Sequence, residues 1–129
     1  MTANTPIVQI IDDDPAICDA LAELFGSVEL AVKTYPSAFA FLAQLSPEIA
    51  GCVVTDIHMP EMSGLELLRQ LQVSNPQLPV IVMSGGAGWA GRAEVLKGGA
   101  VAFIEKPFDD DVLLAAVWAA LADQAGSAA

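Results

Sequence analysis

Apolar and polar residues alternate along this chain in blocks that predict five strands, each followed by a helix. Short runs of apolar, largely β-branched residues, typical of buried parallel strands, lie at residues 7–11, 29–34, 52–55, 79–83 and 101–104. Apolar residues at helical spacing follow each run, at residues 15–26, at 37–45, after Ser63 as far as Asn75-Pro76, up to about Lys97, and beyond Asp109. Five such units with short connections predict an α/β fold, a doubly wound (βα)5 architecture with a five-stranded parallel sheet.

The length of 129 residues indicates a single domain over residues 1–129 that can bury a core without disulfides or metal clips. We expect an ordered core from about residue 7 to 123, with flexible ends at 1–6 and 124–129.

The apolar faces of the helices predict which residues enter the core. In the second helix the pattern favours Phe39, Leu42 and Leu45 as the buried side. The last helix is apolar over most of its circumference between Val112 and Leu121, which is more apolar surface than one face can bury against a sheet. The second strand is less apolar than the others, so we expect it near an edge.

The charge and the cysteines narrow the class of function. The net charge is −11, and the five Lys and Arg residues are scattered, so neither nucleic acid nor an anionic membrane is an expected direct partner. Cys18 and Cys52 fall in a predicted helix and a predicted buried strand, which indicates reduced packing residues in a cytoplasmic protein. No secretory signal opens the chain, and the longest apolar run, residues 112–122, is too short to span a bilayer.

Polar residues follow the strands at the places where parallel strands end. Asp12 and Asp13 follow the first strand, Asp56 the third, Ser84 the fourth and Lys106 the fifth. If the first and third strands are neighbours, three carboxylates meet at one edge of the sheet and repel one another. A hard divalent cation with oxygen ligands relieves this repulsion, and Mg²⁺ fits best. With a lysine and a hydroxyl nearby, the set suits phosphoryl transfer to a carboxylate nucleophile.

With these motifs the chain resembles the receiver domain of two-component response regulators, most closely the FixJ-type branch. The resemblance rests on Asp12-Asp13, on the run TDIHMPEMSGLELL around Asp56, on Ser84-Gly85 and on FIEKPF around Lys106. It covers roughly residues 7–123. It implies the flavodoxin-like strand order 2-1-3-4-5. It also implies a cytoplasmic signalling protein that is not a conventional enzyme but catalyses phosphoryl transfer to itself and its own dephosphorylation with Mg²⁺.

The resemblance assigns the acidic residues to phosphoryl acceptance and metal binding. Asp56 would accept a phosphoryl group from a phosphohistidine of a sensor histidine kinase. Asp13 and Asp56 would ligate Mg²⁺ directly, together with the backbone carbonyl of His58. Asp12 would hold a metal-bound water. Asp14 is interpreted as a charge at the helix N-terminus without a ligand role.

The resemblance assigns other residues to a conformational switch. Lys106 would pair with the phosphate or with Asp56, and the Lys106-Pro107 bond would be cis. Ser84 would move toward the phosphate and Phe103 would turn inward. These movements would remodel the face formed by the fourth helix, fifth strand and fifth helix, for dimerisation or for a downstream protein partner.

Two alternatives remain to be distinguished from this function. Gly86, Gly88 and Gly91 form a GxGxxG pattern after a strand, with Glu105 about 20 residues on, which is typical of dinucleotide binding. That motif normally opens a sheet, whereas here it follows the fourth strand. A receiver that serves only for docking is the other alternative, and the complete set of acidic, Ser and Lys residues argues against it. The same glycines predict a weak fourth helix, and Trp89 is expected to be exposed.

Overall fold

The computed structural model describes residues 6–85 and 91–128 of the chain. Ten elements alternate in the predicted order. The strands are β1 (Ile7–Ile11), β2 (Ala31–Tyr35), β3 (Gly51–Asp56), β4 (Val80–Ser84) and β5 (Ala102–Glu105). The helices are α1 (Pro15–Ser27), α2 (Ala38–Leu42), α3 (Gly64–Ser74), α4 (Arg92–Lys97) and α5 (Asp110–Ala128).

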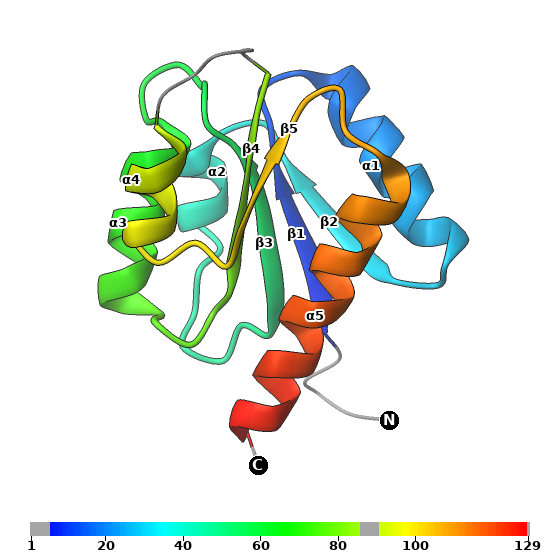
Figure 1. The fold of residues 1–129 in the computed structure, drawn as a ribbon. Helices are drawn as coiled ribbons and strands as arrows, with labels where there is room; N and C mark the ends of the chain where they lie inside the picture. The colour runs from blue at the N-terminus through cyan, green and yellow to red at the C-terminus, as the bar shows by residue number, and fades with distance from the viewer. Residues whose placement is uncertain (1–5, 86–90, 129) are drawn as a thin grey trace.

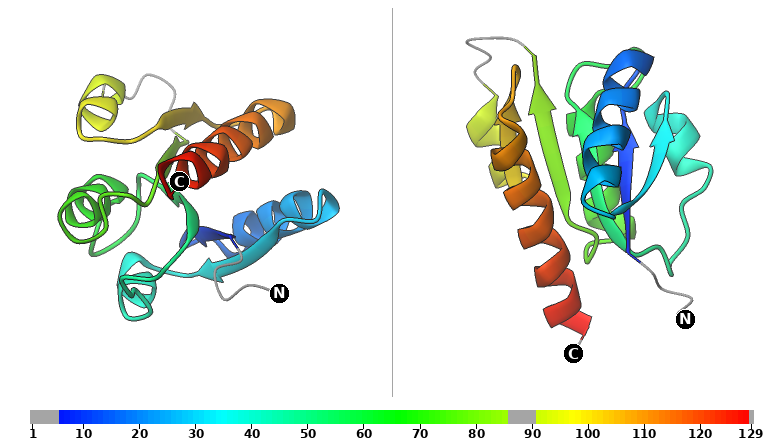
Figure 2. Two further views of the ribbon diagram at one scale, coloured as in Figure 1. Left: turned by 90° about the horizontal axis from the view of Figure 1, so that it is seen from below. Right: turned by 90° about the vertical axis from the view of Figure 1, so that its right-hand side faces the viewer.

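All strand pairs are parallel, and the order across the sheet is β2-β1-β3-β4-β5. This confirms the doubly wound sheet and the strand order that the resemblance implies. Helices cover both faces (Figures 1 and 2): α1 and α5 lie on one side, and α2, α3 and α4 on the other. Since β1 and β3 are neighbours, their carboxyl ends lie side by side, with Ile11 opposite Thr55.

The sheet separates two apolar clusters. Under α2, α3 and α4 the fully buried side chains include Phe41, Leu67, Leu68, Leu71 and Val95. Under α1 and α5 they include Leu21, Phe25, Leu113 and Val117. Every residue of β3 and β4 is buried, whereas the edge strand β2 buries only Tyr35. The most buried strands therefore lie in the middle of the sheet, as the apolar runs predict.

Side-chain caps fix where the helices begin. The Asp14 carboxylate accepts a hydrogen bond from the Ala16 N–H (2.9 Å), as expected for a residue at the N-terminus of α1. Ser63 and Glu66 form a capping box on α3, with bonds of 3.2 and 3.0 Å to each other's backbone N–H. Before α5, Asp109 accepts from the Asp111 N–H (2.8 Å).

The second strand begins two residues later than predicted. The N–H groups of Glu29 and Leu30 donate to the carbonyls of Gly26 and Phe25, so these residues close the C-terminal turn of α1. Glu29 has a φ of 65°, which a strand cannot accommodate. The chain joins the sheet only at Ala31, which pairs with Ile7.

The predicted buried face of the second helix is wrong. Phe39 is 51% exposed, whereas Phe41 is fully buried, and Leu42 and Leu45 are half-buried. The helix has only five residues, so contacts with neighbouring elements, and not the helical period, decide which of its side chains are buried. Phe41 packs edge-on against Tyr35 of β2, with ring centroids 5.2 Å apart.

The ends of the last elements also differ from the predictions. Helix α4 is short and begins at Arg92, in agreement with the weak helix expected there, while Gly86, Gly88 and Trp89 lie outside the described residues. Helix α5 continues to Ala128, whereas a flexible tail was expected from residue 124. Val101 is 48% exposed and precedes β5 instead of opening it.

The two cysteines are free and buried, as predicted. Burial raises the pKa of Cys52 to about 12. Within the described residues, no helix combines the length and the apolar character needed to cross a membrane.

Candidate functional site

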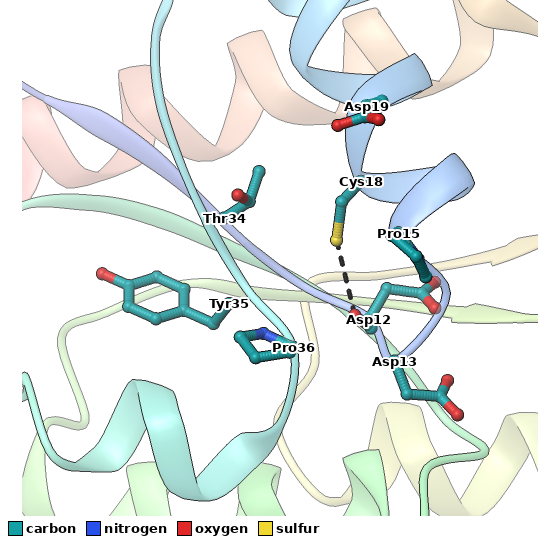
Figure 3. A pocket seen from close by; sticks show the side chains of 8 residues that line it. All are labelled: Asp12, Asp13, Pro15, Cys18, Asp19, Thr34, Tyr35 and Pro36. Atoms are coloured by element: carbon teal, nitrogen blue, oxygen red, sulfur yellow. Dashed lines mark hydrogen bonds between the residues drawn. The ribbon is translucent and has the colours of Figure 1, made fainter.

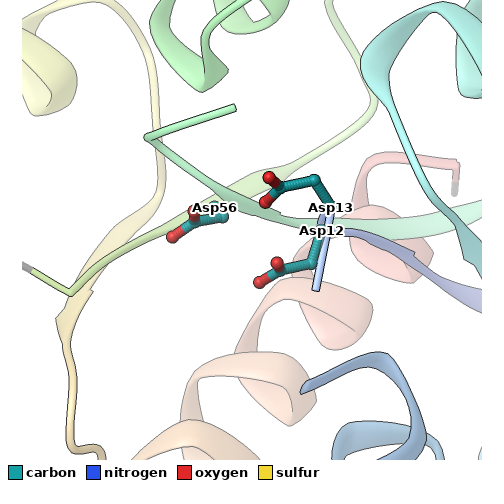
Figure 4. A group of neighbouring side chains, drawn as sticks. All are labelled: Asp12, Asp13 and Asp56. Carbon is teal, nitrogen blue, oxygen red and sulfur yellow. The ribbon is translucent and has the colours of Figure 1, made fainter. Parts of the chain in front are cut away.

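Three carboxylates meet at the carboxyl edge of the sheet. Asp12 and Asp13 follow β1, and Asp56 ends β3 on the neighbouring strand. One oxygen of each lies within 4.8 Å of the others, and Figure 4 shows the three side chains pointing into the same space. Asp12 and Asp56 are buried, whereas Asp13 is exposed. The structure thus brings together the three acids that the strand ends predict.

Lys106 provides the positive charge beside these acids. Its Nζ lies 3.3 Å from Asp12 Oδ2, to which it donates a hydrogen bond, and 3.1 Å from Asp56 Oδ1. The contact with Asp56 has the distance of an ion pair but not the angles of a hydrogen bond. The Lys106 side chain is only 19% exposed, so water screens these contacts weakly. The sequence predicted the pair with Asp56 but not the one with Asp12.

The backbone holds Lys106 in place from the neighbouring strand. The Lys106 N–H donates to the Ser84 carbonyl (2.7 Å), which extends the pairing of β4 and β5 by one residue. The Lys106-Pro107 peptide bond is cis, the conformation that the resemblance implies.

Burial and charge act on these groups in opposite directions. Burial raises the pKa of the Asp12 carboxyl, and the hydrogen bond from the Asp14 N–H together with the Lys106 charge offsets only part of this rise. For Lys106, burial alone lowers the pKa, but contact with the Asp56 and Asp12 carboxylates outweighs it and the pKa is raised. The site therefore carries more negative charge than one lysine can balance.

The donor set fits a hard divalent cation. Three carboxylates supply oxygen ligands close enough to share one ion. Among the described residues, Asp56 Oδ1 is the buried side-chain oxygen that accepts no hydrogen bond. A buried carboxylate oxygen without a donor is costly unless a positive charge lies against it, and the Lys106 ammonium, 3.1 Å away, supplies that charge in the absence of a metal.

Loop geometry sets the position of Asp56. The Ile57 N–H donates to the Met83 carbonyl (2.8 Å), and the Gly64 N–H donates to the Ile57 carbonyl (3.0 Å). A Cβ at Gly64 would lie 2.4 Å from the Asp56 carbonyl oxygen, so only glycine lets α3 start this close to the end of β3. The sequence pattern begins this helix after Ser63 but does not single out Gly64, although its place directly at the helix start was a usable signal.

The other predicted residues lie around this edge at different depths. Ser84 ends β4 and is 1% exposed, one position beyond Met83, the residue opposite Asp56 in the sheet. Phe103 lies on β5 opposite Val82 and is 7% exposed. His58 follows Asp56 by two residues, with its side chain exposed. Ser84 and His58 therefore lie beside Asp56, whereas Phe103 lies on the edge strand β5, and the roles of all three stay predictions.

A cavity of about 340 Å³ lies beside the acids, between the start of α1 and the end of β2 (Figure 3). The Cys18 thiol forms its inner wall and donates to the Asp12 backbone carbonyl (3.4 Å). Burial raises the pKa of Cys18, with the Asp12 charge adding to the effect, so the thiol stays protonated and able to donate. This contact, which the sequence did not predict, fixes the backbone that presents Asp12.

Comparison with known proteins agrees with this geometry. A family model described as the response regulator receiver domain matches residues 8–118. The response regulator protein TodT of Pseudomonas putida is 40% identical over 121 residues, covering 94% of this chain and 53% of TodT. The transcriptional regulatory protein FixJ of Azorhizobium caulinodans is 47% identical over 114 residues, covering 88% of this chain and 54% of FixJ. The chain therefore spans about half the length of these curated relatives.

Solved structures show the same fold. The crystal structure of FixJ-N superposes with a TM-score of 0.83 at 41% identity, covering 94% of this chain and 95% of that one. The low-resolution structure of the response regulator StyR gives a TM-score of 0.89 at 33% identity, covering 95% of this chain and 62% of that one.

Proposed function

Because this chain belongs to the family of response regulator receiver domains, we propose that Asp56 accepts a phosphoryl group from a phosphohistidine of a sensor histidine kinase, in a reaction that requires Mg²⁺. The observation that carries this proposal is the meeting of Asp12, Asp13 and Asp56 within 4.8 Å, with the Lys106 ammonium 3.1 Å from Asp56. The family membership favours this function over dinucleotide binding at Gly86, Gly88 and Gly91.

In the proposed reaction an Asp56 carboxylate oxygen attacks the phosphorus atom. A phosphorus–oxygen bond forms and the phosphorus–nitrogen bond breaks, with its electron pair remaining on the imidazole. The imidazole, which carries a proton on its other ring nitrogen, leaves as a neutral group. Lys106 balances the charge that the phosphoryl oxygens bring to the buried edge, since its Nζ already lies against Asp56 Oδ1.

We assign the metal site to Asp13, Asp56 and the His58 backbone carbonyl, with Asp12 holding a metal-bound water. When bound, Mg²⁺ supplies a positive charge that neutralises the carboxylates and the transferring phosphoryl group. The three carboxylates, each with one oxygen within 4.8 Å of the others, support this assignment. Asp13 supports it as well, because its exposed carboxylate leaves a path for a hydrated ion to enter.

We also propose that phosphorylation acts on Ser84 and Phe103 and changes the face formed by α4, β5 and α5. Exposed apolar side chains that a partner could cover lie on α4, on α5 and directly before β5, namely Leu96, Val101, Val112 and Trp118, which are 38–54% exposed. A second receiver or a downstream protein would bind there. As a partner of a sensor kinase, the protein would act in the cytoplasm.

Phosphoryl transfer from acetyl phosphate tests the acceptor assignment directly. With Mg²⁺, the wild type should form a phosphoprotein detectable on a phosphate-affinity gel, and Asp56→Asn should form none. Asp19→Asn, which removes an exposed carboxylate on α1 outside the cluster, is the matched control and should be labelled normally. Labelling of Asp56→Asn at the wild-type rate would overturn the assignment, and labelling unaffected by EDTA would overturn the Mg²⁺ requirement.

Partner identity and the switch face need separate measurements. Phosphotransfer profiling against candidate sensor kinases from the same genome should single out the kinase that labels Asp56 fastest. Beryllofluoride with Mg²⁺ should promote self-association or partner binding, measured by light scattering and by partner affinity. An unchanged mass together with an unchanged affinity would remove the proposed role of the α4–β5–α5 face.

A further inference from the structure

Arg92, the first residue of α4, makes two contacts with Phe103 of β5. Its guanidinium carbon lies 5.4 Å from the centre of the Phe103 ring, within the range of a cation–π contact. Its Nη1 lies 3.5 Å from the Phe103 backbone carbonyl oxygen, at the long end of hydrogen bonding. One side chain therefore touches both the ring and the backbone of the same residue.

Phe103 needs such a contact because its ring closes an edge of the core. It lies on β5, an edge strand, and is buried with the α4 residue Val95 in the same apolar cluster. The guanidinium is planar and weakly hydrated, so it can lie over an aromatic ring while its outer side remains in water. Arg92 is itself exposed. It covers Phe103 without being removed from solvent.

The same contacts position α4. This helix has only six residues, and its N-cap, Gly91, makes no side-chain hydrogen bond to it. A helix of this length is not stable alone and depends on tertiary contacts. Arg69 of α3 reaches Glu94 of α4 over 3.6 Å, but both side chains are about 60% exposed and such pairs contribute little. Arg92 and the buried Val95 both tie α4 to the cluster that contains Phe103.

We propose that Arg92 is a positioning residue that holds Phe103 in its buried orientation and thereby couples α4 to the phosphoryl-acceptor site. The coupling rests on the proposed function, in which phosphorylation favours the inward orientation of Phe103, the orientation that the ring has in this structure. If Arg92 and a phosphoryl group favour the same orientation, each strengthens the other, because coupling between two sites is reciprocal. Loss of Arg92 then exposes Phe103 and weakens the binding of a phosphoryl analogue.

Fluorine NMR tests the first half of this proposal without any ligand. 4-Fluorophenylalanine is placed at position 103, and the change in its shift between H₂O and D₂O reports exposure of the ring. We expect a small solvent shift in the wild type, a large one in Arg92→Gln and an intermediate one in Arg92→Lys, which keeps the charge but not the planar group. Lys97→Gln removes the same charge from the other end of α4 and should behave like the wild type.

Beryllofluoride titration with Mg²⁺, followed through the same fluorine resonance, tests the second half. The apparent affinity of Arg92→Gln should fall by about two- to fivefold, the range expected for loss of one exposed cation–π contact. An unchanged solvent shift in Arg92→Gln would overturn the positioning role, and an exposed ring with unchanged affinity would overturn the coupling. If the wild type binds no beryllofluoride, the proposed function fails, and the solvent shift still decides whether Arg92 holds Phe103.

Discussion

Replacement of Asp12 by Asn should stabilise this chain when no divalent cation is present. Asp12 is 2% exposed and has two carboxylates within 4.8 Å, and its pKa is raised, first of all by burial. Ionised Asp12 therefore lowers the free energy of unfolding at neutral pH. Asn has nearly the same shape, and its side-chain oxygen can still accept the hydrogen bond from the Asp14 N–H.

The size of the expected change in the free energy of unfolding follows from the charges around Asp12. At an effective dielectric constant of about 20, the Lys106 charge 3.3 Å away attracts Asp12 by about 5 kcal/mol, and the Asp56 charge within 4.8 Å repels it by about 3.5 kcal/mol. The exposed Asp13 adds about 1 kcal/mol of repulsion in water-like surroundings. Attraction and repulsion nearly cancel, so the burial cost decides the sign. We expect Asp12→Asn to raise the free energy of unfolding by about 1–2 kcal/mol.

The pH dependence of this gain has a definite sign. Since the folded pKa of Asp12 lies above its ordinary value of 3.8, the folded state binds this proton more tightly than the unfolded state. Wild-type stability therefore falls as the pH rises from about 3.8 through the folded pKa, and the variant lacks this fall. The advantage of Asp12→Asn is absent below pH 3.8 and complete above the folded pKa.

Urea unfolding followed by far-UV circular dichroism, in EDTA and in Mg²⁺, measures both effects. Mg²⁺ at one hundred times its dissociation constant should stabilise the wild type by about 2.7 kcal/mol. Loss of a group that orients a metal ligand weakens metal binding by about 10- to 100-fold, so the variant should gain much less. Asp19→Asn, with the same charge change, controls for the overall negative charge. The reasoning is wrong if Asp12→Asn is less stable than the wild type in EDTA. It is also wrong if, in EDTA, Asp12→Asn raises the free energy of unfolding by no more than Asp19→Asn does.

Three further changes have effects that the structure sets. Lys106→Met leaves Asp12 and Asp56 without their shared counter-charge and should lower stability by about 2–3 kcal/mol. Because the folded pKa of Lys106 is raised, its contribution is complete below pH 10.5 and disappears as the pH rises through the folded pKa, so thermal unfolding of the two proteins should converge in alkali. Ser63→Ala removes the capping box of α3 and should cost about 1 kcal/mol in urea unfolding. Gly51→Ala should abolish folding, judged by circular dichroism, because φ is +115° and a Cβ would lie 1.9 Å from a backbone oxygen, whereas Gly26→Ala, with open space around it, should fold normally.

The sequence was sufficient to predict that the three acids meet, because all three lie at the ends of strands. Buried apolar runs located β1 and β3, and the residues after them, Asp12, Asp13 and Asp56, had to share one edge once the strands were neighbours. The second contact of Lys106, with Asp12, could not be predicted this way. It depends on where a flexible side chain ends, 94 residues along the chain from its partner.

The sequence predictions are wrong or incomplete where an element is too short to show a period, or where a residue type is common on protein surfaces and so indicates no particular role. In α2, five residues offer two aromatic rings, and the one that enters the core is chosen by Tyr35 on another element. Glu29 has a positive φ although glutamate seldom adopts one. Arg92 gave no signal, since an arginine at a helix start is usual on a protein surface. The role proposed for Arg92 comes only from the position of the Phe103 ring beneath its guanidinium.

The proposed phosphorylation of Asp56 should move the weakly held elements of the fold and leave the buried central strands in place. The acids extend from β1 and β3, and the Asp56 strand is buried along its whole length, so repulsion among the acids cannot be relieved by moving these strands. The Lys106 backbone is tied to Ser84 on β4, and from there the pairing passes to the edge strand β5. Beyond β5 lies α4, the six-residue helix that Arg92 tethers to Phe103. Local opening favours elements with few buried contacts, so a change of charge at Asp56 should move α4 and Phe103 before it moves any central strand.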